Sequence, residues 1–175
     1  MKIAVLVANG TEEIEALTVV DVVRRADTVC DIVSIGKEKV IGSHGIIITA
    51  DKTINKVNLP DYDCVVIPGG MPGAKNISEN DVAINGISEA IRFEKTVAAI
   101  CAAPAVVLAE HKLIGNKKVT CFPAKDFIDT IVSARGIYTG KNVEQDGNII
   151  TANGPRSAMD FALAVCKSLG ITPRI

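Results

Sequence analysis

The sequence predicts an α/β fold with a mostly parallel sheet and helices on both faces. Strand-like and helix-like segments alternate along the chain, which is the pattern of parallel sheets. Residues 3–7 and 64–67 form continuous apolar runs, as expected for strands that are buried on both faces. There is no internal repeat, low-complexity stretch or linker, so we expect a single domain over residues 1–175.

In the first half of the chain, a helix is expected directly after strand 3–7. Thr11 is the expected N-cap of this helix, and apolar residues at helical spacing form its buried stripe: Val19, Val22, Val23 and Ala26. Apolar runs predict further strands over 29–35, 46–50 and 64–67, and the last of these ends at Pro68-Gly69-Gly70. A second helix is predicted over 82–94.

In the second half, residues 96–100 predict a strand that leads into Cys101, and a short helix follows Pro104 to about residue 110. Residues 119–122 are a further strand candidate. Segments 143–145 and 148–152 flank Asp146-Gly147, a strong signal for a hairpin turn. Pro155 opens a final helix, which Gly170 ends.

Composition excludes several classes of function. The net charge is −1 with no basic stripe, and aromatic residues make up only 3%, so we expect no nucleic-acid or membrane partner. The chain has no G-x-G-x-x-G motif after a strand and no phosphate-binding P-loop motif, so no nucleotide cofactor is expected. Its five cysteines include no C-x-x-C pair, which predicts neither a zinc site nor disulfides and favours a cytoplasmic location.

The most informative motif is Ala99-Ile100-Cys101-Ala102-Ala103-Pro104. It predicts a sharp turn from a strand into a helix, with a thiol at the turn between small neighbours, as at a nucleophile elbow. A helix N-terminus carries partial positive charge and free N–H groups, so this position favours the reactive thiolate form. The alternative is a buried structural cysteine.

Two other strand ends are expected to lie beside Cys101, because sites in open α/β sheets gather at the carboxyl ends of the strands. Glu15 precedes the apolar pair Ala16-Leu17 and is expected to point inward, where burial would raise its pKa and make it a proton donor or acceptor for the thiol. The backbone N–H groups of Gly70 and Ala102 are candidates for an oxyanion hole, although Gly69-Gly70 also fits a simple tight turn. Glu12 and Glu13 are explained by the helix dipole, and nothing in the sequence marks His44 or His111 as a catalytic base.

These motifs, together with Gly154-Pro155, occur in an order that resembles the ThiJ/PfpI superfamily, most closely the branch of the Parkinson-disease-associated protein deglycase. The resemblance implies a flavodoxin-like three-layer sandwich that forms a homodimer. It implies that Cys101 is the elbow nucleophile and Glu15 its protonated carboxyl partner. It also implies that the amides of Gly70 and Ala102 line the oxyanion site and that the activity needs no cofactor. No cluster of metal ligands is visible in the sequence, so no metal is expected.

The chain departs from the family pattern at several positions. The peptidase branch carries a histidine directly after its elbow cysteine, where this chain has Ala102. Relatives in the closer branch often place a histidine at the position of Phe122, and arginines at the positions of His44 and Asn153. The departures disfavour peptidase activity and remove an expected proton shuttle and a small anion site.

The function expected from the resemblance is a glyoxalase III or protein deglycase activity. Cys101 would attack a small 2-oxoaldehyde, or its adduct on a glycated protein, and Glu15 would move the proton. The alternative is a redox sensor or stress-response holdase in which Cys101 is oxidised to a sulfinic acid. An intracellular cysteine peptidase is the third possibility.

Overall fold

The computed structural model describes all residues 1–175 and contains a main sheet of seven strands. In spatial order these are β10 (Val143–Asp146), β11 (Ile149–Ala152), β7 (Thr96–Ile100), β6 (Cys64–Ile67), β1 (Lys2–Val7), β2 (Val29–Ser34) and β5 (Lys52–Thr53). All neighbours pair in parallel except β10 and β11, which form the predicted antiparallel hairpin. The prediction of a mostly parallel sheet is confirmed.

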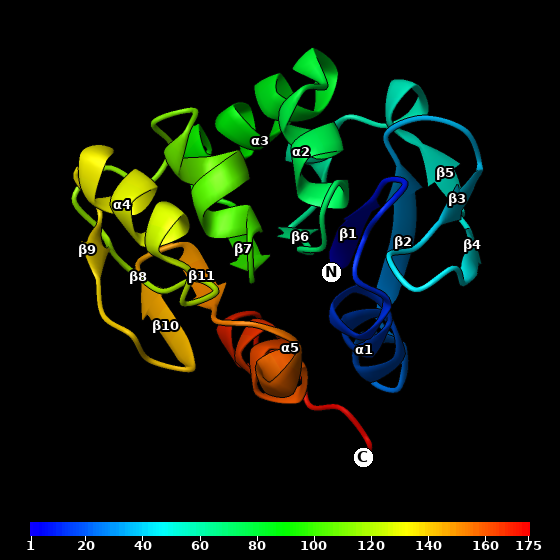
Figure 1. Ribbon diagram of the computed structural model, residues 1–175. Helices are drawn as coiled ribbons and strands as arrows, with labels where there is room; N and C mark the ends of the chain where they lie inside the picture. Colours follow the sequence, from blue (N-terminus) through cyan, green and yellow to red (C-terminus); the bar gives the residue numbers. More distant parts are fainter.

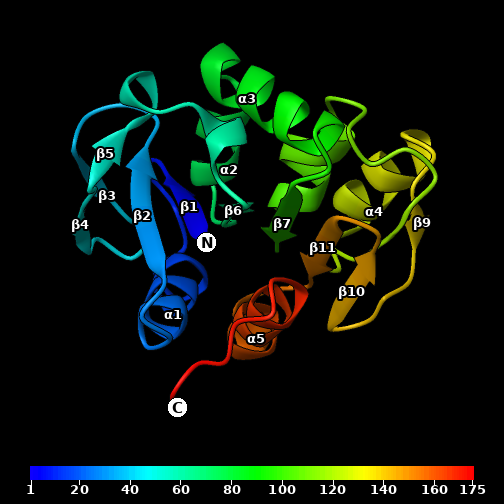
Figure 2. The same cartoon turned by 180° about the vertical axis from the view of Figure 1, so that it is seen from behind.

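Helices cover both faces of this sheet, as Figures 1 and 2 show. One face carries α1 (Glu13–Arg24) and α5 (Ala158–Ser168), which pack against each other. The other face carries α2 (Gly73–Ser78), α3 (Asp81–Arg92), the π-helical segment η3 (Pro104–Ala109) and α4 (Lys125–Ser133). Each interface between helices and sheet has its own buried apolar cluster. The arrangement is the expected three-layer sandwich of the flavodoxin type.

The apolar character of the central strands follows from this double coverage. Strand β1 pairs with β2 on one side and β6 on the other, and its residues 3–7 are fully buried. Alternate side chains point to opposite faces of a sheet, so one strand supplies both cores. Leu6 belongs to the cluster under α2 and α3, whereas Val5 belongs to the cluster under α1 and α5.

Short strands form two accessory pairs outside the main sheet. Strands β3 (Lys39–Ile41) and β4 (Ile47–Thr49) make an antiparallel hairpin, so the strand predicted over 46–50 does not extend the main sheet. Strands β8 (Lys118–Val119) and β9 (Ile137–Tyr138) pair in parallel. The strand predicted over 119–122 is therefore mostly a loop, and Phe122 at its end is exposed.

The prediction of Thr11 as a helix cap is wrong. The hydroxyl oxygen Oγ1 of Thr11 accepts a hydrogen bond from the N–H of Ala8 at 2.9 Å, and α1 begins two residues later without a side-chain cap. Thr11 thus stabilises the turn that follows β1. At α3, in contrast, Asn80 is a true cap, because its side-chain oxygen accepts a hydrogen bond from the N–H of Ala83 at 2.9 Å.

Three short 3₁₀ turns complete the chain: η1 (Ile54–Lys56), η2 (Leu59–Asp61) and η4 (Pro155–Ser157), the last of which leads into α5. None of the helices is both long and apolar enough to cross a membrane.

The strand order brings the predicted site together. The chain passes from β1 outward to β2 on one side, and later from β6 to β7 on the other side. Such a reversal of strand order is where open α/β sheets place their ligands, beyond the carboxyl ends of the strands. The segments after β1, β6 and β7 all begin at this edge. The first leads into α1, which carries Glu15, and the other two carry Gly70 and Cys101.

Candidate active site

Cys101 lies directly after β7 in a backbone conformation that is unusual for a side-chain-bearing residue. Its φ is +65°, in the left-handed region, which costs a non-glycine residue of order 1–3 kcal/mol. Hydrogen bonds hold the peptide on both sides: the N–H of Cys101 donates to the carbonyl of Ala152 at 2.9 Å, and the carbonyl of Cys101 accepts from the N–H of Phe122 at 2.8 Å. The surrounding structure therefore maintains a strained elbow that presents the thiol.

Glu15 lies on the first turn of α1 and is completely buried. Its Oε2 accepts a hydrogen bond from the N–H of Gly69 at 2.8 Å, whereas its Oε1 is buried without a hydrogen-bond partner. Burial raises the pKa of Glu15 to about 7, and the charge of Glu12 acts in the same direction, while the Gly69 amide and the Cys101 thiol lower it. The prediction of an inward-pointing Glu15 with a raised pKa is confirmed.

Burial and the Glu15 carboxyl group also affect the ionisation of the Cys101 thiol. Burial and the neighbouring Glu15 carboxyl group together raise the pKa of Cys101 to about 12, while the backbone amides of Gly70 and Ala102 act in the opposite direction. Burial and the Glu15 carboxyl group therefore oppose the thiolate that the elbow position favours, whereas the two backbone amides support it. At neutral pH, Glu15 is near its midpoint and can accept the proton of the thiol.

Gly70 and Ala102 are the two residues whose backbone amides act to lower the thiol pKa. Gly70 has a φ of +85°, which favours glycine, and a Cβ there would lie 2.4 Å from the backbone nitrogen of Glu12. The loop after β6 thus packs directly on the loop after β1. This contact aims the Gly70 amide at the end of β7.

Gly69 lies between Cys101 and Glu15, and because it has no side chain the two residues can approach each other closely. A Cβ on Gly69 would lie 2.6 Å from the Cβ of Cys101 and 2.7 Å from Oε2 of Glu15. We expect Gly69→Ala to lower the free energy of unfolding by roughly 1–3 kcal/mol, since such crowding forces packed groups apart. The matched control is Gly36→Ala, where no atom lies within 4 Å of the new methyl group.

Denaturant unfolding of both variants measures this difference, and the reactivity of Cys101 should fall only in Gly69→Ala. Equal stability of Gly69→Ala and the unsubstituted protein would mean that the two side chains are not held in contact through this glycine.

Neither histidine lies in hydrogen-bond contact with Cys101. The ring of His111 pairs with Ser78, and His44 pairs with Ser43 and Glu13. Cys101 is also the only cysteine that is partly exposed, because Cys30, Cys64, Cys121 and Cys166 are buried. The arrangement is therefore a cysteine–glutamate pair and not a cysteine–histidine dyad.

The sequence reasoning missed the role of Glu13. This side chain is only 4% exposed, and its carboxylate accepts hydrogen bonds from the backbone N–H groups of His44 at 2.8 Å and Ile46 at 3.4 Å. These bonds hold the pKa of Glu13 at about 2 despite its burial. Glu13 therefore fastens the β3–β4 hairpin to the start of the helix that carries Glu15.

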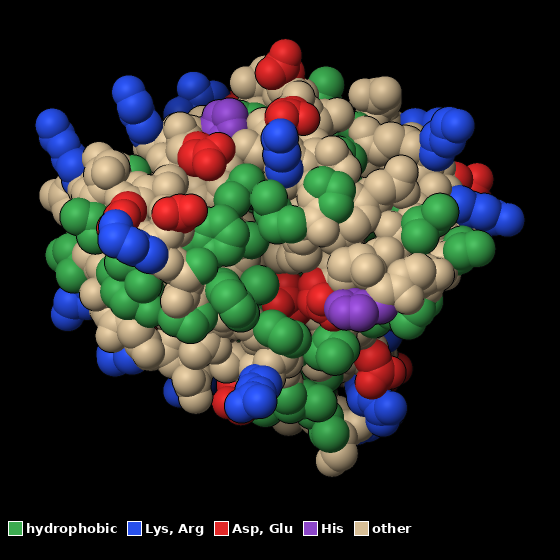
Figure 3. All heavy atoms as spheres, viewed as in Figure 1, with side chains coloured by type: hydrophobic (Ala, Val, Ile, Leu, Met, Phe, Trp, Pro, Cys, Tyr) green, Lys and Arg blue, Asp and Glu red, His purple; other side chains and the backbone are tan.

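Possible metal-ligating atoms of Glu12, Glu13 and His44 lie within 4.8 Å of one another, a grouping that the sequence did not reveal. On the face seen in Figure 3, acidic side chains and a histidine lie side by side in a hollow bordered by hydrophobic side chains, which fits this cluster. Within this cluster, Nδ1 of His44 lies 3.1 Å from Oε2 of Glu13 and 3.4 Å from Oε2 of Glu12.

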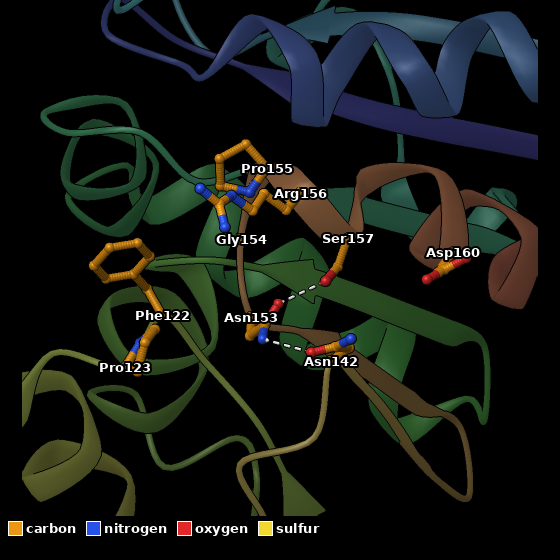
Figure 4. A pocket seen from close by; sticks show the side chains of 9 residues that line it. All are labelled: Phe122, Pro123, Asn142, Asn153, Gly154, Pro155, Arg156, Ser157 and Asp160. Carbon is orange, nitrogen blue, oxygen red and sulfur yellow. Dashed lines mark hydrogen bonds between the residues drawn. The ribbon is translucent and has the colours of Figure 1, made fainter.

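A pocket of about 500 Å³ opens beside the elbow, and Figure 4 shows its side chains. It is lined by Phe122, Pro123, Asn142, Asn153, Gly154, Pro155, Arg156, Ser157 and Asp160. Cys101 and Glu15 are not among these residues. Gly154-Pro155 is one of the motifs found in the sequence. The polar residues around this pair were not predicted, because they do not form a recognisable sequence motif.

The chain is thus an α/β sandwich protein with a cysteine at a strand-to-helix elbow and a buried carboxyl group beside it, at the point where the strand order reverses. The DJ-1/PfpI family model matches residues 1–168. The chain belongs to the DJ-1/PfpI family.

Several relatives show how far the similarity extends. The Parkinson disease protein 7 homolog of Danio rerio is 34% identical over 168 residues, which cover 94% of this chain and 87% of that protein. The structure of oxidized DJ-1 from Toxoplasma gondii has a TM-score of 0.90 and 37% identity, with 96% of this chain and 90% of that chain covered. Protein DJ-1 homolog B of Arabidopsis thaliana is 34% identical over 165 residues, 94% of this chain, but the chain spans only 37% of that protein's length.

Proposed function

We propose that this protein is a cysteine-dependent enzyme that converts small 2-oxoaldehydes, or their adducts, to 2-hydroxy acids without a cofactor. The observation that carries the proposal is that Cys101 and a buried Glu15 carboxyl group meet at Gly69, with one carboxyl oxygen left without a hydrogen-bond partner. A carboxyl group with a pKa near neutrality both accepts and returns protons at physiological pH.

In the first step, Glu15 accepts the thiol proton as the Cys101 sulfur adds to the aldehyde carbon. A C–S bond forms, and the electron pair of the C=O double bond moves to the oxygen. The amides of Gly70 and Ala102 stabilise the negative charge on this oxygen. Glu15 then returns the thiol proton to this oxygen, which gives a hemithioacetal and leaves Glu15 ready to act as a base.

In the second step, Glu15 moves a proton from the former aldehyde carbon to the adjacent ketone carbon, and the hydroxyl proton of the hemithioacetal passes to the ketone oxygen. The first carbon is thereby oxidised to a thioester and the second is reduced to an alcohol, so no external oxidant or reductant is needed. Water then hydrolyses the thioester, which releases the hydroxy acid and restores the thiol. With methylglyoxal the product is lactate.

For an adduct on an amino group, the reacting carbon is a hemiaminal, so its C–S bond forms as its C–N bond breaks. Glu15 passes the thiol proton to the departing amine, and the same second step and hydrolysis then release the hydroxy acid. Peptidase activity has no comparable support, because the residue after Cys101 is Ala102 and both histidines are bonded elsewhere. The cysteine–glutamate pair supports proton transfer within a small substrate.

The direct test is lactate formation from methylglyoxal by the purified protein, followed by NMR. We expect many molecules of lactate for each protein molecule. Protein that has first been alkylated at Cys101 is the control, and it should form none. Consumption of one equivalent without further turnover would contradict the proposal and favour a sensor or holdase that reacts once at Cys101.

A further inference from the structure

The pocket beside Cys101 is much larger than a small aldehyde requires. Two of its lining residues are connected to the elbow through the backbone. The N–H of Phe122 donates to the carbonyl of Cys101, and Asn153 directly follows Ala152, whose carbonyl accepts from the N–H of Cys101. A volume of about 500 Å³ is in the range that holds drug-sized ligands. A three-carbon oxoaldehyde fills only a small part of it, so the pocket fits a substrate that carries the oxoaldehyde on a larger group.

Two opposite charges line this pocket without pairing. Arg156 and Asp160 are four residues apart and both exposed, yet neither takes part in any ion pair of the chain. Figure 4 shows the two side chains on opposite sides of Ser157. The pocket therefore offers a cationic side and an anionic side at the same time.

The neutral polar groups of the pocket are oriented by one another. The hydroxyl of Ser157 donates to Oδ1 of Asn153 at 2.7 Å, and Nδ2 of Asn153 donates to Oδ1 of Asn142 at 3.1 Å. This order leaves the amide nitrogen of Asn142 as a donor without a partner in the chain. The Phe122 ring, in a residue that is 43% exposed, adds an apolar wall.

The opposite charges of Arg156 and Asp160 favour some classes of ligand over others. A phosphate or other doubly charged anion would be repelled by Asp160, and a simple amine would be repelled by Arg156. A zwitterion satisfies both: its carboxylate faces the Arg156 guanidinium and its ammonium group faces Asp160. An aliphatic stem between the two charges and Cys101 would lie against Phe122.

We propose that this pocket binds the α-amino and α-carboxylate groups of a free amino acid whose side chain carries the oxoaldehyde adduct. The inference rests on the proposed function, since it places that side chain at Cys101. It makes adducts of free amino acids, and not adducts within a polypeptide, the preferred substrates, because the α groups of an internal residue are uncharged amides.

Binding of simple probes tests the pocket independently of catalysis. We expect L-norleucine to bind, as measured by NMR titration or calorimetry, and hexanoate and pentylamine, which each lack one of its two charges, to bind at least about tenfold more weakly. Arg156→Gln should weaken norleucine binding by about tenfold. Lys167→Gln is the matched control, because it removes one positive charge from the exposed surface of α5, the helix that follows Arg156, and should leave binding unchanged.

A kinetic comparison tests the substrate preference. The kcat/KM for the side-chain adduct of free lysine should exceed that for the same adduct on Nα-acetyl-lysine amide by about tenfold or more, and Arg156→Gln should remove this preference. Equal values for the two substrates, or norleucine binding no tighter than hexanoate binding, would overturn the inference. Absence of all turnover together with selective norleucine binding would instead contradict the proposed reaction and leave the amino-acid site standing.

Discussion

Cys101→Ala is expected to lower lactate formation from methylglyoxal by at least about a thousandfold, to the level of the protein-free reaction. Alanine cannot form the C–S bond, and no other thiol is partly exposed near the carboxyl ends of the strands. The variant should remain folded, since alanine is smaller than cysteine and the backbone hydrogen bonds of residue 101 do not involve the side chain. Lactate measured by NMR, with circular dichroism to confirm folding, provides the test.

The matched control is Cys30→Ala. Cys30 is buried in β2, where it is paired with Ile3 of β1 near the amino ends of the strands, at the opposite edge of the sheet from Cys101. Its removal should leave turnover unchanged. Lactate formation by Cys101→Ala at the normal rate would exclude the thiol as nucleophile.

Glu15→Gln is expected to lower the rate of lactate formation and to raise the free energy of unfolding above neutral pH. Glutamine keeps an oxygen that accepts from the N–H of Gly69, but it cannot accept the thiol proton. Loss of a general base typically costs 10²–10⁴-fold in rate, so we expect a decrease of about that size. The rate of the unsubstituted protein should rise with pH through about 7 as Glu15 ionises, and this rise should be absent from the variant.

The stability effect follows from the raised pKa. Below the ordinary pKa of 4.5, Glu15 is protonated in both the folded and the unfolded chain, so it contributes nothing to the pH dependence. Between 4.5 and about 7, only the unfolded chain releases the proton, and the free energy of unfolding falls as the pH rises. Above pH 7 the accumulated cost is about 3 kcal/mol.

Glu15→Gln removes this cost, so the variant should be more stable than the unsubstituted protein at pH 8 and of similar stability at pH 4. Denaturant unfolding at the two pH values measures the difference. Glu110→Gln is the control, because it replaces an exposed carboxyl group at the end of η3. A stability gain that is the same at both pH values would show that Glu15 does not titrate near neutrality.

The sequence predicted those features that depend on local pattern. Buried parallel strands such as 3–7 and 64–67 are recognisable because both of their faces are apolar. The elbow at Cys101 is recognisable because small residues surround a thiol between a strand and a proline. The inward direction of Glu15 followed from the apolar residues after it.

Features that depend on distant partners were not predicted. Thr11 and Glu13 both have polar side chains at a helix start, but Thr11 bonds back to Ala8 and Glu13 bonds to a hairpin some 30 residues away. The high pKa of Cys101 arises from burial and from Glu15, which the local elbow motif does not encode. The unpaired charges of Arg156 and Asp160 likewise become meaningful only once the pocket is formed.

The two outer strands of the sheet have a consequence for self-association. An open sheet invites another strand to pair with its free edge, which is a common route to aggregation. Here one edge is β5, only two residues long and including Lys52. The other edge is β10, whose Asp146 already accepts a hydrogen bond from the N–H of Lys118. Short length and charge thus make both edge strands poor templates for an added strand. The sheet can therefore present a reactive cysteine at the ends of its strands without extending from one molecule to the next.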